Sequence, residues 1–323
     1  MFFIVHPVLV FSSILVNRKT PNLAIEPIRV GFALFFRPPF VILVTGMPRR
    51  RFTTIVIFLL LFQSAGAVFS QADKKAKIGR TLAVTDAGKW KTIQKGLEFR
   101  RIVMERSEPG YELEFKLLRV DSQIIVPRVL SADSFQLKSA NAKTFAEKAG
   151  AIAAINANYF DEKGRPLAYL KTADKEINRS VSKHRLYTGI FGVAESGPFV
   201  THRDEFQPGQ ASAALQSGPL LLHHSAPVEI MSGLGRYARR SVIGTDKEGR
   251  VLIGVTDGVI GGLSFAELQE LFTQPKWQLD AVELLNLDGG GSAQLYVKSG
   301  KFEEWLPGTA EVPVAIGLFS KSN

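Results

Sequence analysis

The chain has 323 residues, no cysteine and a formal net charge of +10. The absence of cysteine excludes disulfide bonds, a thiol nucleophile and a lipid-modified cysteine. The charge does not indicate a nucleic-acid partner, because there is no basic block with interleaved aromatic residues. Residues 1–72 hold 7 of the 40 Lys and Arg but one of the 30 Asp and Glu, so the remaining chain carries only +4.

Residues 47–72 have the pattern of a signal peptide. Arg49, Arg50 and Arg51 are followed by an apolar run over 52–62 and by small residues before position 72. The run is too short for a comfortable membrane span. We therefore predict export to the periplasm or the exterior, no stable membrane span after processing, and a mature chain of residues 73–323.

Residues 1–46 precede this pattern and contain two further apolar runs. One interpretation is upstream sequence read through from a misassigned start codon. The alternative is a genuine membrane-associated leader. Under either interpretation, residues 73–323 are long enough for one domain with a sizeable core.

The first third of this domain is predicted to be rich in strands. Apolar or alternating runs cover residues 97–105, 112–120 and 123–126, and turn sequences separate them. Residues 141–148 are typical of a short helix that Gly150 closes. A buried strand over 151–155 follows and ends on Asn156.

Two strands near the C-terminus are predicted to form a hairpin. They cover residues 240–245 and 250–256, with Asp246 and Gly249 paired across the turn. In this register Arg240 lies opposite Val255. Arg240 and Asp257 would then be diagonal neighbours, roughly 7–8 Å apart at the backbone.

A strand–helix–strand unit is predicted over the next segment. Ser264 and Glu267 form the signature of a capping box for a helix that ends near residue 272, and an apolar strand follows over 281–287. A crossover of this kind makes its strands parallel, so Asp257 and Asp288 would emerge at one sheet edge. The predicted fold class is α+β: a mixed, sheet-rich single domain with a few helices and at least one such crossover.

The most informative motif is Asp288 followed by Gly289, Gly290, Gly291 and Ser292. Consecutive glycines cost order, so this position requires bare backbone beside a carboxylate. A closely approaching ligand is one explanation. A flexible hairpin turn that begins with Asp is the other.

Each remaining candidate residue also has a purely structural explanation. Arg240 and Asp257 could form an exposed ion pair of little energetic value. Asn156 could satisfy loop backbone, and Ser217 with Gly218 could form only a turn before a strand. The histidines show no metal-ligand spacing, and His223 and His224 would point to opposite faces of a strand.

Taken in order, several motifs resemble the phosphodiester glycosidase family. They are the segment 151–161 with Asn156 and Tyr159, the Ser217-Gly218-Pro219 turn, residues 240–244, the strand end at Asp257, and residues 286–292. The resemblance extends from about residue 96 to 318. The chain departs from it at Asn158, where the family usually has Gly; Asn tolerates a positive φ better than most residues.

This resemblance implies hydrolysis of a sugar 1-phosphodiester to a sugar and a phosphomonoester. It implies a catalytic group of Asp288, Asp257, Arg240 and Asn156. Arg240 would clamp the phosphate, helped by backbone amides of residues 289–292, and Ser217 and Gly218 would also bind the substrate. Asp288 would be the nucleophile or the general base, and Asp257 would orient it or share that task.

Two alternatives stay open from the sequence. The first is an envelope polysaccharide-binding or assembly protein without turnover. The second is a phosphodiesterase that holds a hard cation with Asp257 and Asp288. We predict a sugar-phosphate or envelope-glycan substrate and neither a required cofactor nor a metal ligand set, while leaving a divalent cation open.

Overall fold

The computed structural model describes residues 82–231, 233–258 and 261–321. All of them belong to one compact unit, Gln63–Asn323. The upstream segment 1–46 and the signal peptide 47–72 lie outside the described residues, so both stay predictions. Within the described ranges, no helix has the length and apolar character needed to cross a membrane.

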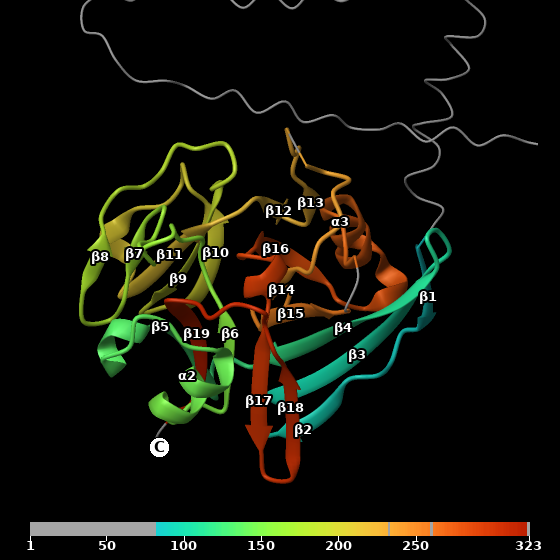
Figure 1. Ribbon diagram of the computed structural model, residues 1–323, viewed down its shortest axis with the longest axis horizontal. Coiled ribbons are helices and arrows are strands. Elements are labelled where there is room, and N and C mark those ends of the chain that lie inside the picture. The colour runs from blue at the N-terminus through green and yellow to red at the C-terminus, as the bar shows by residue number, and fades with distance from the viewer. Residues whose placement is uncertain (1–81, 232, 259–260, 322–323) are drawn as a thin grey trace, which may run out of the picture. The chain divides into compact units, whose positions relative to one another are not determined.

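The largest sheet has nine strands (Figure 1). Its order is β1-β3-β4-β15-β14-β16-β12-β13, with β2 beside β3. The strands are β1 (Leu82–Asp86), β2 (Lys91–Gln94), β3 (Leu97–Arg106), β4 (Tyr111–Val120), β12 (Leu220–His223), β13 (Ala226–Pro227), β14 (Ser241–Asp246), β15 (Val251–Asp257) and β16 (Ala281–Asn286).

Two five-stranded sheets complete the fold. One has the order β10-β9-β11-β7-β8 and the other β18-β17-β6-β19-β5. Their strands are β5 (Ile125–Ser131), β6 (Ala153–Asn156), β7 (Leu170–Lys171), β8 (Glu176–Asn178), β9 (Gly189–Ala194), β10 (Gly197–His202), β11 (Ala213–Ser217), β17 (Leu295–Ser299), β18 (Phe302–Leu306) and β19 (Val314–Ser320).

Only two α-helices accompany these sheets in the described ranges: α2 (Ala142–Ala149) and α3 (Phe265–Thr273). Short 3-10 turns cover Ala132–Phe135, Pro208–Gln210, Pro275–Trp277 and Gly290–Ser292. The sheet-rich prediction is confirmed, but the architecture is mainly β rather than α+β. Helix α2 begins after its N-cap Asn141 and ends at Gly150, whose φ is +66°.

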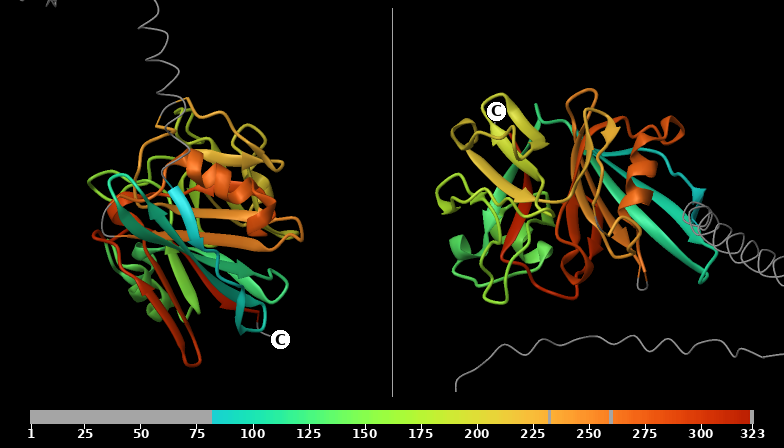
Figure 2. Two further views of the ribbon diagram at one scale, coloured as in Figure 1. Left: turned by 90° about the vertical axis from the view of Figure 1, so that its right-hand side faces the viewer. Right: turned by 90° about the horizontal axis from the view of Figure 1, so that it is seen from above.

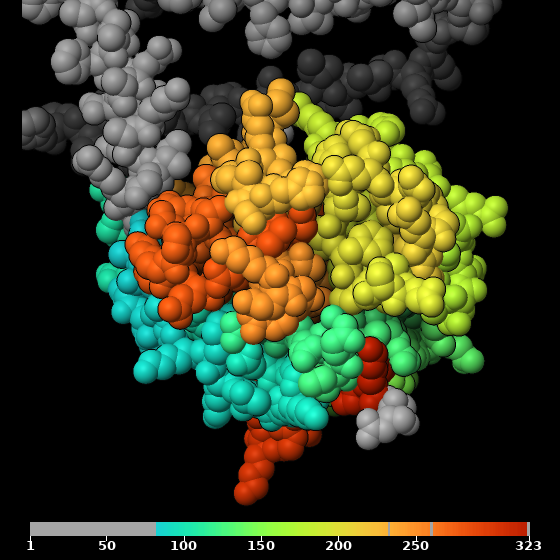
Figure 3. Space-filling model, turned by 180° about the vertical axis from the view of Figure 1, so that it is seen from behind, coloured from blue at the N-terminus to red at the C-terminus, as the bar shows by residue number. Residues whose placement is uncertain are grey.

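The nine-stranded sheet is buried on both faces. One face shares a large apolar core with the two smaller sheets, to which residues such as Ile155, Leu215 and Ile253 contribute. The other face packs against α3 through Leu252, Leu268 and neighbouring side chains. Figure 2 shows α3 on the side of this sheet that faces away from the smaller sheets. Figure 3 shows, from behind, the yellow segment of β9–β11 beside the gold segment that follows it along the chain.

The hairpin of β14 and β15 forms with a register one residue away from the prediction. Ser241, not Arg240, pairs with Val255, and Thr245 pairs with Val251. The cause is Gly249, which adopts φ +74° and adds a residue to the turn. Arg240 consequently lies opposite Thr256, whose backbone amide donates to the Arg240 carbonyl at 2.9 Å.

The strand–helix–strand unit of β15, α3 and β16 differs from the prediction in one respect. Both strands pair antiparallel with β14, which lies between them. They therefore run in the same direction without being neighbours, and their carboxyl ends lie at the same sheet edge. Ser264 and Glu267 form the predicted capping box at the start of α3.

Candidate active site

The end of β6 fixes the main chain of Asp288. The Asp288 amide donates to the Ala157 carbonyl at 2.9 Å, and its carbonyl accepts from Asn156 Nδ2 at 2.6 Å. The carboxylate accepts hydrogen bonds from the Gly289 amide at 2.9 Å and from the Ser292 side chain. Burial raises the pKa of Asp288, and these two hydrogen bonds offset that shift only in part.

Tyr159 lies close enough to Asp288 for the charge of that carboxylate to affect its hydroxyl. Its hydroxyl donates to the Gly218 carbonyl at 3.1 Å and accepts from Asn286 Nδ2 at 3.0 Å. Burial and then the charge of Asp288 raise the pKa of Tyr159, whereas Arg240 acts in the opposite direction. One phenol thus interacts with both the predicted anion-binding residue and the predicted catalytic carboxylate.

Tyr187 adds a second phenol to this environment. Its ring centroid lies 5.4 Å from that of Tyr159. Burial, followed by the charge of Asp288, raises the pKa of Tyr187 as well. Two neutral aromatic rings thus lie near the Asp288 carboxylate.

Arg240 is a buried cation with a side chain only 7% exposed. Its guanidinium donates to the carbonyls of Leu263 at 2.9 Å and Arg236 at 2.5 Å, and it lies 4.0 Å over the Phe265 ring. Among the described residues, no carboxylate forms an ion pair with it. Burial lowers the pKa of Arg240 to about 10, so the group stays charged at neutral pH. A buried charge without a counter-ion is suited to an anionic ligand.

The predicted neighbourhood of Arg240 and Asp257 is wrong. Because Arg240 lies opposite Thr256, the next side chain along the strand, Asp257, points to the other face. Lys116 Nζ binds the Asp257 carboxylate at 2.7 Å and the Glu304 carboxylate at 2.7 Å. Burial lowers the pKa of Arg239, and the charge of Asp257 acts against that shift. Asp257 thus interacts electrostatically with Arg239 and not with Arg240. The strand end that carries Asp257 still lies at the same sheet edge as Asp288.

Two of the three glycines after Asp288 are needed because other protein atoms approach them closely, and Gly290 adopts a φ of +59°. A Cβ atom on Gly289 would lie 2.7 Å from the Arg239 carbonyl, and one on Gly291 would lie 2.7 Å from Thr309 Oγ1. The amides of Gly289 and Gly290 already donate to Asp288 Oδ1 and the Arg239 carbonyl. The Ser292 amide donates to the Gly289 carbonyl. Of the four amides predicted to bind an anion, at most that of Gly291 is available.

Asn156 links three elements and is fully buried. Besides the bond to Asp288, its Oδ1 accepts from Ser241 Oγ at 2.7 Å and from the Gln294 amide at 3.1 Å. The residue therefore positions Asp288. Asn158 is also buried, and its backbone is not in the left-handed region.

Buried polar atoms without a hydrogen-bond partner gather along the same chain segments. Within the part of the chain that the structure describes, they include Ser217 Oγ, Asn158 Oδ1 and Asn286 Oδ1. Ser217 precedes Gly218, whose carbonyl accepts from Tyr159 and Asn286. Because such orphaned atoms are rare in folded proteins, their concentration here favours a binding site.

Of the predicted site residues, Asn156 bonds the Asp288 main chain, and Arg240 lies beside Gly289, where an added Cβ would be 4.0 Å from its Cδ atom. The Gly218 carbonyl is joined to the Asp288 strand through Asn286. Sequence reasoning gave no role to Asn286, Tyr187 or Arg239. The sequence did contain a signal for Asn286. It is a polar residue in an apolar strand, two positions before Asp288, and a buried polar side chain needs a hydrogen-bond partner. A separate surface recess of about 910 Å³, lined by Glu195, Phe199, Glu205 and neighbouring residues, contains none of the predicted site residues.

Three solved structures are similar in fold. A hypothetical protein from Synechocystis is similar with a TM-score of 0.53 and 16% sequence identity. The match covers 72% of this chain and 64% of that protein. The zebrafish N-acetylglucosamine-1-phosphodiester alpha-N-acetylglucosaminidase catalytic domain, auto-inhibited by its pro-peptide, has a TM-score of 0.54 at 16% identity over 73% of this chain and 87% of its own. A putative exported protein from Burkholderia pseudomallei K96243 has a TM-score of 0.50 and 10% sequence identity, and the match covers 74% of this chain and 97% of that protein.

At these identities the structural likeness establishes the fold alone. A comparison with curated proteins gives no match. The comparison with protein families matches residues 149–319, which is more than half of the chain and includes Asn156, Arg240, Asp257 and Asp288. The chain therefore belongs to the phosphodiester glycosidase family.

Proposed function

We propose that this protein is an exported glycosidase that hydrolyses the bond between a sugar and the phosphate of a sugar 1-phosphodiester. The products are the free sugar and a phosphomonoester of the second alcohol. Membership of the family supports the reaction class. The observation that carries the assignment to this site is that backbone hydrogen bonds join the residues on both sides of Asp288 to those on both sides of Arg240. The Leu287 amide donates to the Ser241 carbonyl at 2.8 Å, and the Gly290 amide donates to the Arg239 carbonyl at 2.9 Å.

In this proposal Arg240 binds the phosphodiester. Its guanidinium is buried, charged at neutral pH and not paired with a carboxylate among the described residues. An incoming phosphate would supply the missing negative charge. It would also compensate part of the desolvation that burial imposes on the guanidinium.

Asp288 supplies the attacking group or activates water. In both cases the C1–O bond breaks and its electron pair leaves with the phosphate, a weaker base than an alkoxide. A phosphate has a second pKa of about 6, so it needs less protonation than an ordinary alcohol leaving group. The overall reaction consumes one water molecule, whose oxygen remains on the sugar.

Asp257 has a different role in this proposal from the one that the sequence indicated. Lys116 neutralises its carboxylate at 2.7 Å. Its charge also favours the cationic form of Arg239. We assign Asp257 to holding Arg239 beside the Gly289–Ser292 turn, and we assign no proton transfer to it.

Hydrolysis in ¹⁸O-water tests the reaction. The full-length protein is incubated with a synthetic sugar 1-(alkyl phosphodiester), and both products are analysed by mass spectrometry. The label is expected in the sugar. Label in the phosphate would contradict the proposal and identify a phosphodiesterase that cuts the P–O bond.

Substitution of Asp288 tests the site. Asp288→Asn is expected to lower kcat by about 10²- to 10⁴-fold, the usual contribution of a positioned general base. Asp280→Asn is the matched control, because Asp280 is an exposed carboxylate at the start of the same strand segment and Asn tolerates its φ of +50°. Equal activity of wild type and Asp288→Asn would remove Asp288 from the mechanism.

A further inference from the structure

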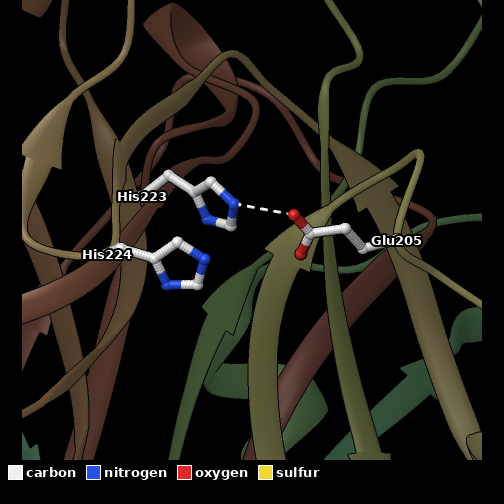
Figure 4. A group of neighbouring side chains, drawn as sticks. All are labelled: Glu205, His223 and His224. Atoms are coloured by element: carbon white, nitrogen blue, oxygen red, sulfur yellow. Dashed lines mark hydrogen bonds and ion pairs between the residues drawn. The ribbon is translucent and has the colours of Figure 1, made fainter.

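A group of histidine and glutamate side chains lies away from Asp288, where the large sheet meets the sheet of β9–β11. It contains Glu205, which follows β10, and His223 and His224 at the end of β12. One ligand atom from each of the three lies within 4.8 Å of the others. Figure 4 shows the two imidazole rings side by side with the Glu205 carboxylate facing them.

The backbone explains why this group was missed in the sequence. Adjacent residues of a regular strand point to opposite faces, which was the prediction for His223 and His224. That prediction is wrong, because β12 ends at His223 and His224 adopts φ +51°. The left-handed residue turns its ring back, and the two rings stack with centroids 3.9 Å apart.

Glu283 holds both rings in one orientation. Its carboxylate oxygens lie 2.9 Å from His223 Nδ1 and 3.2 Å from His224 Nδ1. The side chain of Glu283 is 10% exposed, and one of its oxygens also accepts from the His224 amide at 2.9 Å. With Nδ1 of each ring facing Glu283, Nε2 is the nitrogen that each ring offers to a ligand; on His223 a bound metal ion would replace the proton that Nε2 shares with Glu205.

Glu205 presents one oxygen to this pair of nitrogens. His223 Nε2 lies 3.0 Å from Glu205 Oε1, while Thr201 Oγ1 donates to Glu205 Oε2 at 2.7 Å. Glu205 and Thr201 also line the recess of about 910 Å³ beside β10. Glu205 is 52% exposed, so solvent can reach the space that its carboxylate faces.

We propose that Glu205, His223 and His224 bind a divalent transition-metal ion of the zinc class. Two imidazole nitrogens and one carboxylate oxygen are a common zinc ligand set that leaves a fourth position for water. Glu283 supplies the outer carboxylate that ligating histidines almost always contact through their second nitrogen. Hard cations such as Mg²⁺ favour all-oxygen sites and are excluded by the two imidazoles.

The metal would join two sheets that meet at this point. Glu205 follows β10 of the five-stranded sheet, whereas His223 ends β12 of the nine-stranded sheet and His224 comes directly after it. An ion held by both sheets stabilises only the folded state, so it raises the melting temperature. Protons compete with a metal ion for the same ring nitrogens, so Zn²⁺ binding weakens on acidification.

Direct binding of Zn²⁺ tests the site independently of any activity. The full-length protein is purified without a polyhistidine tag and titrated calorimetrically with Zn²⁺, and its melting temperature is measured with Zn²⁺ and with Mg²⁺. We expect one Zn²⁺ per chain and a higher melting temperature with Zn²⁺ only. If the protein binds no Zn²⁺ at a concentration of about 100 µM, well above the dissociation constant expected for a site with these ligands, the proposal is overturned.

Three variants locate the ion. His224→Asn keeps a residue that tolerates the left-handed backbone and removes one ligand, so Zn²⁺ binding should be lost or greatly weakened. Glu283→Gln should lower the affinity by about 10- to 100-fold through the outer contact. His184→Asn removes a histidine outside the group, so this variant should bind Zn²⁺ with the affinity of the wild-type protein. Unchanged affinity in His224→Asn and Glu283→Gln would place the ion elsewhere and refute the site.

Discussion

Asn156 Nδ2 donates a hydrogen bond of 2.6 Å to the main-chain carbonyl of Asp288, across 132 positions of sequence. The same side chain accepts from Ser241 and from the Gln294 amide. This single buried amide thus joins β6, β14 and the segments on both sides of the glycine turn. Asn156 therefore positions Asp288 through its main chain and not through its carboxylate.

Replacing Asn156 by Ala is expected to cost both stability and activity. Two buried donors, from Ser241 and Gln294, lose their acceptor, and the Asp288 carbonyl loses its donor. The free energy of unfolding should fall by roughly 1–3 kcal/mol or more, measured by urea denaturation. Because Asn156 positions rather than reacts, kcat should fall more than KM rises. A variant with wild-type stability and kcat would contradict this role.

Arg240→Lys should weaken substrate binding despite keeping the charge. A lysine ammonium cannot reproduce the planar guanidinium that Arg236, Leu263 and the Phe265 ring hold in place. We expect KM to rise roughly tenfold or more, in line with loss of a charged hydrogen bond. Arg165→Lys, at an exposed arginine, is the control and should leave KM unchanged.

Asp257→Asn should be milder than Asp288→Asn. Asp257 is 42% exposed and paired with Lys116, and it does not contact Arg240. We therefore expect a KM effect smaller than that of Arg240→Lys and no loss of kcat on the scale of general-base removal. Equal loss of kcat in Asp257→Asn and Asp288→Asn would restore the shared role that the sequence indicated.

The buried ion pair of Arg106 and Glu267 should dominate the stability of the α3 face. Arg106 Nη1 lies 2.8 Å from Glu267 Oε1, and the side chains are 0% and 7% exposed. Arg106→Met leaves a buried carboxylate without its cation and should cost about 3–5 kcal/mol in chemical denaturation. Arg101→Met, on the same strand, breaks an ion pair whose arginine is 53% exposed and should cost about 1 kcal/mol or less. Similar losses in both variants would contradict the burial argument.

Local signals in the sequence predicted both α-helices and seven of the nineteen strands in the described ranges. Asn141 and Gly150 delimit α2, and Ser264 with Glu267 opens α3, because caps depend on residues only a few positions apart. The strands near 97–106, 111–120 and 281–286 follow from apolar runs. The order of strands in the sheets, and the sheet of β9–β11, depend on long-range pairing that these runs do not specify.

The errors at the site come from single backbone conformations. Gly249 at φ +74° shifts the β14–β15 register by one residue and moves Asp257 to the face opposite Arg240. His224 at φ +51° brings two histidines together that a regular strand would separate. Left-handed residues outside glycine are uncommon, so an alternation pattern gives no indication of them.

The pH dependence of stability gives a final prediction, for Asp288. Burial raises its pKa in the folded protein above the ordinary value near 3.9. For such a group, the stabilising contribution is fully present below the unfolded pKa and is lost as pH rises through the folded pKa. Asparagine does not titrate, so the melting temperature of Asp288→Asn relative to wild type should increase as pH rises from about 3 to 7. If the difference between Asp288→Asn and wild type stays constant across this range, Asp288 has an ordinary pKa and burial does not govern its ionisation.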